Sequence, residues 1–201
     1  MLTVEQATRA LEEHRGDALA VVTMSPLAYW HPRDDDYGLM GLMGGAGSIG
    51  LGLAVGLPER RVLVVDGDGS LLMQLGVLSA VGGTAPANLA YAVIDNSMYA
   101  ISGGQPMPVA TDWPALMTAV GFRRAVSCES ADDVRAALAD TDGGPIGLVI
   151  RCEAARPAYP PGSFAVDPAE EAHRLRRVLA GPVQGTTTSS VSAGSAGWRS
   201  T

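Results

Sequence analysis

The sequence predicts a three-layer α/β fold in which helices cover both faces of a mostly parallel sheet. Residues 62–65 form a continuous apolar run, typical of a strand buried on both faces. A similar run at 89–94 follows an apolar segment at 70–81 that suits a crossover helix. Both runs end in polar residues, Asp66-Gly67-Asp68-Gly69 and Asp95-Asn96. Because ligands bind at the carboxyl ends of parallel strands, we expect a binding site there.

The composition fits one folded domain, which we expect to cover residues 1–180. The chain has 201 residues, of which 47% are hydrophobic and 17% charged, enough for one well-filled core. Its net charge of -7 argues against binding to nucleic acids or anionic membrane surfaces, which need excess basic charge. No apolar run reaches the roughly 18 residues that span a bilayer, and the N-terminal residues do not resemble a signal peptide. We therefore expect a cytoplasmic protein.

Two residue types narrow the chemistry further. The sequence contains no lysine, which excludes a Schiff-base lysine and a phosphate-binding Walker lysine within this chain. Its two cysteines, Cys128 and Cys152, lack metal-ligand spacing. We expect buried thiols rather than a disulfide.

The first 40 residues predict a helix, a strand and a long loop. Thr3 and Gln6 form a capping box for a helix that ends near His14, and residues 18–24 are the first predicted strand. Residues 25–40 contain prolines and the run Asp34-Asp35-Asp36. We interpret this segment as a loop and its acidic run as a solvated turn, with a ligand-binding loop as the alternative.

Residues 41–56 are rich in glycine within an apolar background. This pattern indicates close approach of the backbone to a ligand or to another element. Gly45, Gly47 and Gly50 match G-x-G-x-x-G. Because no clear strand precedes the match and no suitable acid follows it, we reject a dinucleotide-binding site.

The rest of the chain alternates between predicted helices and strands. In order, we expect a loop at 100–110, a helix from Asp112 to Val120, a strand at 122–127, a helix at 131–139 capped by Ser130, a strand at 146–151 and a helix at 168–179. Residues 181–201 are rich in Gly, Ser and Thr, and we expect a disordered tail there.

The polar strand ends predict a magnesium-bridged diphosphate site. Gly67 and Gly69 permit a tight turn beside Asp68, and the helix that follows presents free N–H groups suited to phosphate. Asp68 and Asn96 supply the oxygen ligands that Mg²⁺ prefers.

These residues resemble the cofactor motif of thiamine diphosphate (ThDP) enzymes. Gly67-Asp68-Gly69, followed by Asp95-Asn96 at the next strand end, is similar to that family's diphosphate motif. The resemblance implies a ThDP-binding fold with Mg²⁺ held by Asp68, Asn96 and the Met98 carbonyl. It also implies contacts to the diphosphate from Gly67, Gly69, Ser70 and Ser97.

A second motif agrees with this resemblance. Gly41-Leu42-Met43-Gly44 resembles the turn that props the cofactor in its bent form in these enzymes. The resemblance implies that Met43 is the prop and that Gly41 accepts a hydrogen bond from the aminopyrimidine. Without the diphosphate motif, a methionine in a glycine-rich core turn would be the better interpretation.

Residues 15–155 are similar to the ThDP-binding part of sulfopyruvate and phosphonopyruvate decarboxylases. That similarity implies non-oxidative removal of CO₂ from a small 2-oxo acid. Two places depart from the family pattern: Thr23-Met24-Ser25-Pro26-Leu27-Ala28 lacks its polar run, and Met107 replaces a threonine after Gln105-Pro106. Both changes remove polar groups, so we expect a less anionic substrate.

No catalytic residue is expected in this chain. ThDP enzymes use an activating glutamate from a pyrimidine-binding domain, and Glu12 and Glu13 lie in the first predicted helix, where surface charges are expected. The resemblance therefore implies a heteromer with a pyrimidine-binding (alpha-type) subunit that supplies the glutamate. The candidate substrate contacts are Ser102, Gln105 and His31.

Two other functions stay open at this stage. A ThDP-dependent carboligase of the acyloin or acetolactate synthase type would use the same cofactor site, and pocket shape and water access decide between the two reactions. A non-catalytic paralogue could retain the fold. The sequence does not identify the 2-oxo acid, the partner or the stoichiometry.

Overall fold

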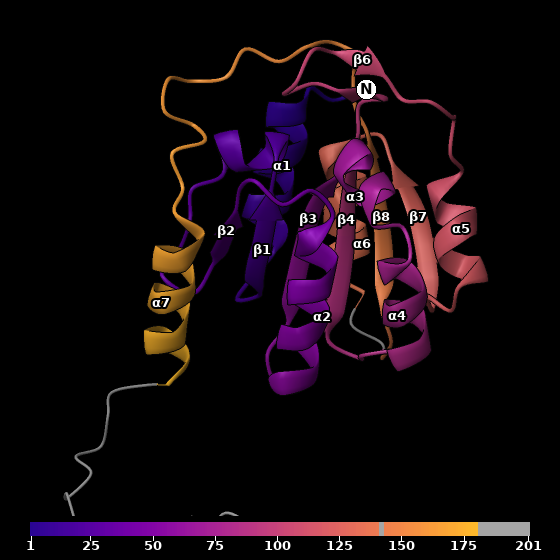
Figure 1. Ribbon diagram of the computed structural model, residues 1–201. Helices are drawn as coiled ribbons and strands as arrows, with labels where there is room; N and C mark the ends of the chain where they lie inside the picture. Colours follow the sequence, from indigo (N-terminus) through magenta and orange to yellow (C-terminus); the bar gives the residue numbers. More distant parts are fainter. Residues whose placement is uncertain (141–142, 181–201) are drawn as a thin grey trace, which may run out of the picture.

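Six parallel strands form one sheet in the computed structural model of the chain, which describes residues 1–140 and 143–180 (Figure 1). The strand order is β2-β1-β3-β4-β8-β7. The strands are β1 (Leu19–Thr23), β2 (Tyr37–Leu39), β3 (Val62–Gly67), β4 (Leu89–Asp95), β7 (Arg124–Cys128) and β8 (Ile146–Arg151). A separate antiparallel pair is formed by β5 (Met98–Tyr99) and β6 (Gln105–Pro106). The predicted tail at 181–201 lies outside the described residues.

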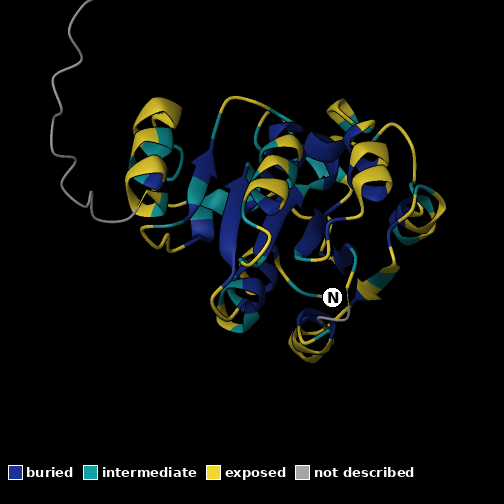
Figure 2. Cartoon of the chain, turned by 90° about the horizontal axis from the view of Figure 1, so that it is seen from below, coloured by how far each residue is buried: buried dark blue, intermediate teal, exposed yellow. Residues whose placement is uncertain are grey.

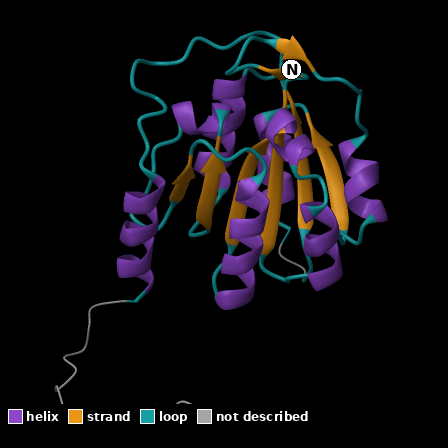
Figure 3. Ribbon diagram, in the orientation of Figure 1, coloured by secondary structure: helices purple, strands orange, loops and turns teal. Residues whose placement is uncertain are grey.

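Helices cover both faces of this sheet, as predicted (Figure 3). The helices packed on one face are α1 (Val4–His14) and α6 (Ala131–Leu138), beside the 3₁₀ helix η1 (Ser25–Tyr29). Those on the other face are α2 (Gly45–Gly56), α3 (Asp68–Met73), α4 (Val77–Thr84), α5 (Trp113–Ala119) and α7 (Pro168–Leu179). The three-layer α/β prediction is therefore confirmed.

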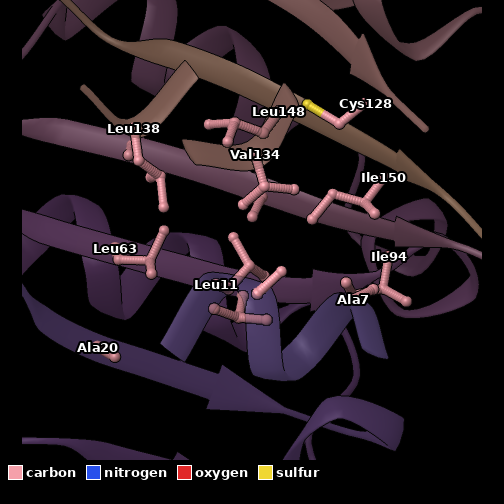
Figure 4. Packing of buried hydrophobic residues seen from close by; sticks show 14 of the residues in the cluster. Ala7, Leu11, Ala20, Leu63, Ile94, Cys128, Val134, Leu138, Leu148 and Ile150 are labelled. Carbon is pink, nitrogen blue, oxygen red and sulfur yellow. The ribbon is translucent and has the colours of Figure 1, made fainter. Parts of the chain in front are cut away.

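Successive strand residues build the two cores. Leu63 packs toward α1 and α6, whereas its neighbour Val64 packs toward α2 and α4, because side chains alternate along a strand. Figure 4 shows the first core, where Leu11 lies between Leu63 and Val134. The strands β1, β3, β4 and β8 are almost wholly buried, whereas the outer faces of the helices are exposed (Figure 2). None of the described helices is long and apolar enough to cross a membrane.

Local sequence signals placed several boundaries correctly. Thr3 and Gln6 form the predicted capping box at the start of α1, and Ser130 forms a second one with Asp133 at the start of α6. Both cysteines are buried and free, as expected.

The apolar segment at 70–81 is not one helix, contrary to the prediction. It is divided into α3 and α4, because Gln74 leaves the helical conformation with φ -136° and ψ 48°. The Gln74 side chain packs against Gly44 and donates to the Met43 carbonyl at 3.4 Å. In addition, α3 begins at Asp68 rather than at Ser70, so the acid lies in the first helical turn.

Residues 25–40 hold η1 and β2 instead of a long loop, and the solvated-turn interpretation is wrong for Asp36. Asp36 is only 1% exposed and forms a two-oxygen ion pair with Arg15, which is equally buried. The Trp30 indole N–H also donates to Asp36, at 3.0 Å. The sequence run alone could not show this, because the cation comes from the end of α1.

Candidate functional site

A cavity of about 560 Å³, including its open mouth, lies where three strands end. Met24 follows β1, Gly67 ends β3 and Asn96 follows β4, and all three line the cavity. In Figure 1 this is the end of the sheet near α3 and the β5–β6 pair. Parallel strands therefore bring three distant chain segments to one binding site, as expected for this fold class.

Asp68 connects two of these segments. Its side chain is buried at the start of α3. Oδ1 accepts from the Gly69 N–H at 2.7 Å, and Oδ2 accepts from the Ser97 N–H at 2.7 Å. The turn after β3 is thereby tied to the turn after β4.

Burial raises the pKa of Asp68 to about 7. The hydrogen bond from Gly69 lowers this pKa, whereas the nearby Asp95 carboxylate raises it further. Asp95 is itself buried, and its closest cation is Arg151 at 3.7 Å. Two acids thus lie close together in a buried place, and a bound cation would favour the charged form of Asp68.

Asn96 is held by the turn that follows β4. Its Oδ1 accepts from the Met98 N–H at 3.3 Å, and its side chain is buried at the cavity wall. Ser97, which lies between Asn96 and Met98 in the chain, has a positive φ of 58° and donates its N–H to both Asp68 and Asp95. This turn places an amide oxygen beside the same cavity as the Asp68 carboxylate.

The predicted Gly41-Leu42-Met43-Gly44 turn reaches the same site. Met43 lines the cavity together with Asp68 and Ser70. The Gly44 N–H donates to Ser70 Oγ at 2.8 Å, which ties this turn to α3. Gly41 and Gly44 lie in the turn but are not among the described residues that line the cavity.

A close contact with the Tyr99 ring explains why a glycine stands at position 69. A Cβ atom at Gly69 would lie 2.7 Å from the Tyr99 ring, closer than real Cβ contacts. Only glycine therefore lets the ring of Tyr99 pack over this turn, and Tyr99 itself lines the cavity.

Asp66 is a supporting residue that the sequence interpretation did not assign to the site. It is fully buried and accepts from the Tyr91 hydroxyl at 3.1 Å and the Gly67 N–H at 2.9 Å. Burial raises its pKa to about 6, opposed by hydrogen bonds that include one from Ser70. These bonds fix the end of β3 against α3. An acid directly before Gly67-Asp68-Gly69 was the available signal.

The structure brings one of the three candidate substrate contacts to the cavity. Ser102 lines it, and its hydroxyl donates to Gln105 at 3.2 Å. Gln105 is exposed on β6 outside the described lining. His31 lies beside α1, where its N–H donates to Glu12 at 2.6 Å and its side chain is 75% exposed.

Sequence reasoning missed an apolar part of the lining. These residues are Ile94, Ala100 and Ile101; Met24 and Pro26, which also line the cavity, lie in the segment at 23–28 that the family resemblance had already linked to the substrate. None of the three missed residues belongs to a motif with a chemical role, so only their position near the strand ends could have indicated that they line the cavity.

The donor set suits a hard cation better than a transition metal. Asp68 contributes a carboxylate and Asn96 an amide oxygen, which are ligands typical of Mg²⁺. Within residues 1–140 and 143–180, no group of three or more His, Cys, Asp or Glu residues is arranged to hold a metal. Any metal at this site would therefore need amide, backbone or ligand oxygens as well.

The comparisons with known proteins agree on one family. Residues 14–148 match the C-terminal TPP binding domain of thiamine pyrophosphate enzymes. Phosphonopyruvate decarboxylase of Streptomyces viridochromogenes is 42% identical over 167 residues, 78% of this chain and 40% of that protein. Sulfopyruvate decarboxylase subunit beta of Methanocaldococcus jannaschii is 48% identical over 79 residues, 39% of this chain and 42% of that protein.

A solved structure supports the same fold. The thiamine diphosphate-dependent 4-hydroxybenzoylformate decarboxylase of Rhodococcus jostii superposes with a TM-score of 0.62 and 19% identity, over 78% of this chain and 33% of that chain. At this identity the likeness concerns the fold alone. The chain spans less than half the length of each of these relatives.

Proposed function

Because the chain belongs to the thiamine pyrophosphate enzyme family, as a C-terminal TPP binding domain, we propose that it is the ThDP- and Mg²⁺-binding subunit of a non-oxidative 2-oxo acid decarboxylase. ThDP and thiamine pyrophosphate are the same cofactor. One observation carries the proposal: Asp68 and Asn96 lie in a single cavity with Met43. The relatives named phosphonopyruvate and sulfopyruvate decarboxylase support the reaction class.

The residues at the site fit a magnesium-bound diphosphate. We assign Asp68, Asn96 and the Met98 carbonyl as the Mg²⁺ ligands. Asp68 and Asp95 are neighbouring buried acids, and a divalent cation there would favour the charged form of Asp68. A Cβ atom at Gly67 would meet nothing within 4 Å, so this part of the lining is open to a ligand.

The remaining cofactor contacts follow from the same placement. Gly67, Gly69, Ser70 and Ser97 would face the diphosphate, with Ser70 held by Gly44 and Asp66. Met43 would contact the cofactor from the cavity wall, and Gly41, in the same turn as Gly44, would accept a hydrogen bond from it. The tied turns hold these groups in place before the cofactor binds.

In the overall reaction, the C1–C2 bond of the 2-oxo acid breaks, CO₂ leaves, and C2 gains a proton to give an aldehyde. When bound, ThDP would supply the carbon that adds to the 2-oxo group and would accept the electron pair that stays on C2 when CO₂ leaves. The contribution of this chain is to orient the cofactor and to shield C2 from water with apolar side chains such as Met24 and Ile101.

We propose that a pyrimidine-binding (alpha-type) subunit supplies the activating glutamate. No glutamate is among the described residues that line the cavity, and the Methanocaldococcus relative is named as a beta subunit. An uncharged groove between α2 and α4 offers a surface for the partner. Its described lining is Ser48, Leu51, Gly52, Val55, Gln74, Gly76, Val77, Ala80 and Thr84.

Calorimetric titration with ThDP and Mg²⁺ tests the cofactor site. Asp68→Ala is expected to lower ThDP affinity by about tenfold or more, since even indirect partners of metal ligands contribute that much. Asp34→Ala removes an exposed acid outside the cavity and serves as the control. Equal affinities for the native chain and Asp68→Ala, with the fold intact by circular dichroism, would contradict the assignment.

Product analysis tests the reaction. The chain assembled with its partner is incubated with a 2-oxo acid, with and without an acceptor aldehyde. Free aldehyde as the only product supports decarboxylation. Formation of an acyloin would assign the assembly to the carboligases instead.

A further inference from the structure

The cavity lining is almost free of charge. Asp68 is the only carboxylate among the described residues that line it, and none of them is Arg, Lys or His. Away from the turn at Gly67–Ser70 and from Asn96, the lining is dominated by apolar side chains: Met24, Pro26, Ile94, Met98, Ala100 and Ile101. Such a surface favours hydrocarbon over a solvated anion.

Buried acids lie near the cavity, and one cation, Arg156, lies beside Gly104 in the loop that carries Ser102. Asp66 and Asp95 are buried beside Asp68. Arg151 lies 3.7 Å from Asp95, but its side chain is 45% exposed and outside the described lining. No cation is among the described lining residues, so an anionic group on C3 of the substrate would lose hydration there without an ion-pair partner from the lining.

Met24 lines this cavity in a backbone conformation that non-glycine residues rarely adopt. Its φ is 58° and its ψ is -137°. Glycine would make the same turn without steric cost. The chain instead holds a flexible thioether at the cavity, in the segment where the sequence lacks the polar run of the decarboxylases.

The structure fixes this turn from both sides. All five residues of β1, which precedes Met24, are buried. After it, η1 is anchored by the Ser25 hydroxyl bonded to the Tyr159 hydroxyl at 2.7 Å, and by the Tyr29 hydroxyl donating to the Ala158 carbonyl at 2.8 Å. Met24 therefore cannot relax by moving the turn alone.

We infer that the substrate is a 2-oxo acid with an uncharged, apolar C3 substituent, and that Met24 is a specificity-determining residue that contacts it. The inference rests on the proposed function. It extends that function by assigning the substrate class, which differs from the phosphono and sulfo acids named for the relatives.

The test measures kcat/KM for CO₂ release by the complete assembly with ThDP and Mg²⁺. The substrates are 4-methyl-2-oxopentanoate and phenylpyruvate as apolar acids, and 3-phosphonopyruvate and 3-sulfopyruvate as anionic ones. We expect kcat/KM for the better apolar acid to exceed that for both anionic acids by about tenfold or more.

Two substitutions at Met24 test its role. Met24→Arg should lower kcat/KM for the apolar acids by about tenfold or more and raise it for the anionic acids. Met24→Gly should raise the melting temperature of the chain, because glycine accepts the turn, and should reduce the preference between the two apolar acids. Met73→Arg, which adds the same charge at an exposed position outside the described lining, should leave the selectivity unchanged.

The outcomes separate this inference from the proposed function. A preference for 3-phosphonopyruvate or 3-sulfopyruvate overturns the inference and leaves the decarboxylase proposal standing. Selectivity that does not change in Met24→Arg overturns the role of Met24. Failure to turn over any apolar acid also overturns the inference, and calorimetry then shows whether ThDP binding, and with it the proposed function, has failed too.

Discussion

At the scale of single residues, Asp36 shows how much one buried carboxylate can organise. Arg15, Trp30, Ala20 and Arg33 all donate to it. The Arg15 guanidinium also lies 4.7 Å from the Trp30 ring centroid, within the range of a cation–π contact. This network joins the end of α1, the start of β1 and the segment before β2.

Asp36→Ala should therefore lower the free energy of unfolding by about 3–5 kcal/mol, because it leaves the buried Arg15 charge without its partner. Asp35→Ala is the matched control within the same acidic run. Asp35 pairs with Arg60 nearer the surface, and its loss should cost about 0–1 kcal/mol. Urea unfolding of the three proteins makes the comparison, and equal losses in both variants would refute the assignment.

The site residues differ in how far the sequence could predict them. The placement of Asp68 and Asn96 in one cavity was predictable because each lies shortly after a buried apolar run, so it depends on local sequence and parallel strand order. The role of Asp36 was not, because it depends on Arg15 at the end of α1. For Met24 the sequence indicated only a departure from the family pattern, because its place in the cavity depends on distant segments that meet.

At the scale of elements, the contact between α2 and β3 determines where the Met43 turn lies. A Cβ atom at Gly50 would lie 2.1 Å from Val64 Cγ2 in the centre of the sheet. Gly50 is thus required by the packing of the helix on the sheet, as the close-approach prediction allowed. The break at Gln74 was not predictable, because the apolar run continues through it.

Two alanine substitutions in α2 should act in opposite directions. Gly50→Ala should destabilise the chain by about 1–3 kcal/mol through overpacking. Gly52→Ala should stabilise it by about 0.5–1 kcal/mol, because its Cβ meets nothing within 4 Å and alanine favours a helix. Thermal unfolding measures both, and the same sign for both variants would contradict the packing described for α2.

At the scale of the whole molecule, the groove between α2 and α4 is a candidate partner surface because its described lining is uncharged. Val55 is 57% exposed in the α2–α4 groove, whose described lining carries no charge. Interface centres are typically depleted of charge. The sequence predicted the partner only through a family resemblance, because no local pattern distinguishes an interface helix from a buried one.

Val55→Asp should weaken association with a co-expressed pyrimidine-binding subunit by about tenfold or more. Val178→Asp, a 40% exposed valine on α7, is the control. Sedimentation of the mixed subunits gives the dissociation constant, and ThDP-dependent CO₂ release shows whether the assembly is functional. Assembly of Val55→Asp as tight as that of Val178→Asp would exclude this groove as the interface.

The methionines of the cavity also make it sensitive to oxidants. Met24, Met43 and Met98 all line it and all are partly exposed. Oxidation to the sulfoxide would replace three apolar thioethers with polar groups at one site. Peptide mass spectrometry after peroxide treatment should show that ThDP with Mg²⁺ protects these three residues, whereas Met1, which is 76% exposed, oxidises equally with or without them. Loss of activity under peroxide should then follow the occupancy of the cavity rather than unfolding of the chain.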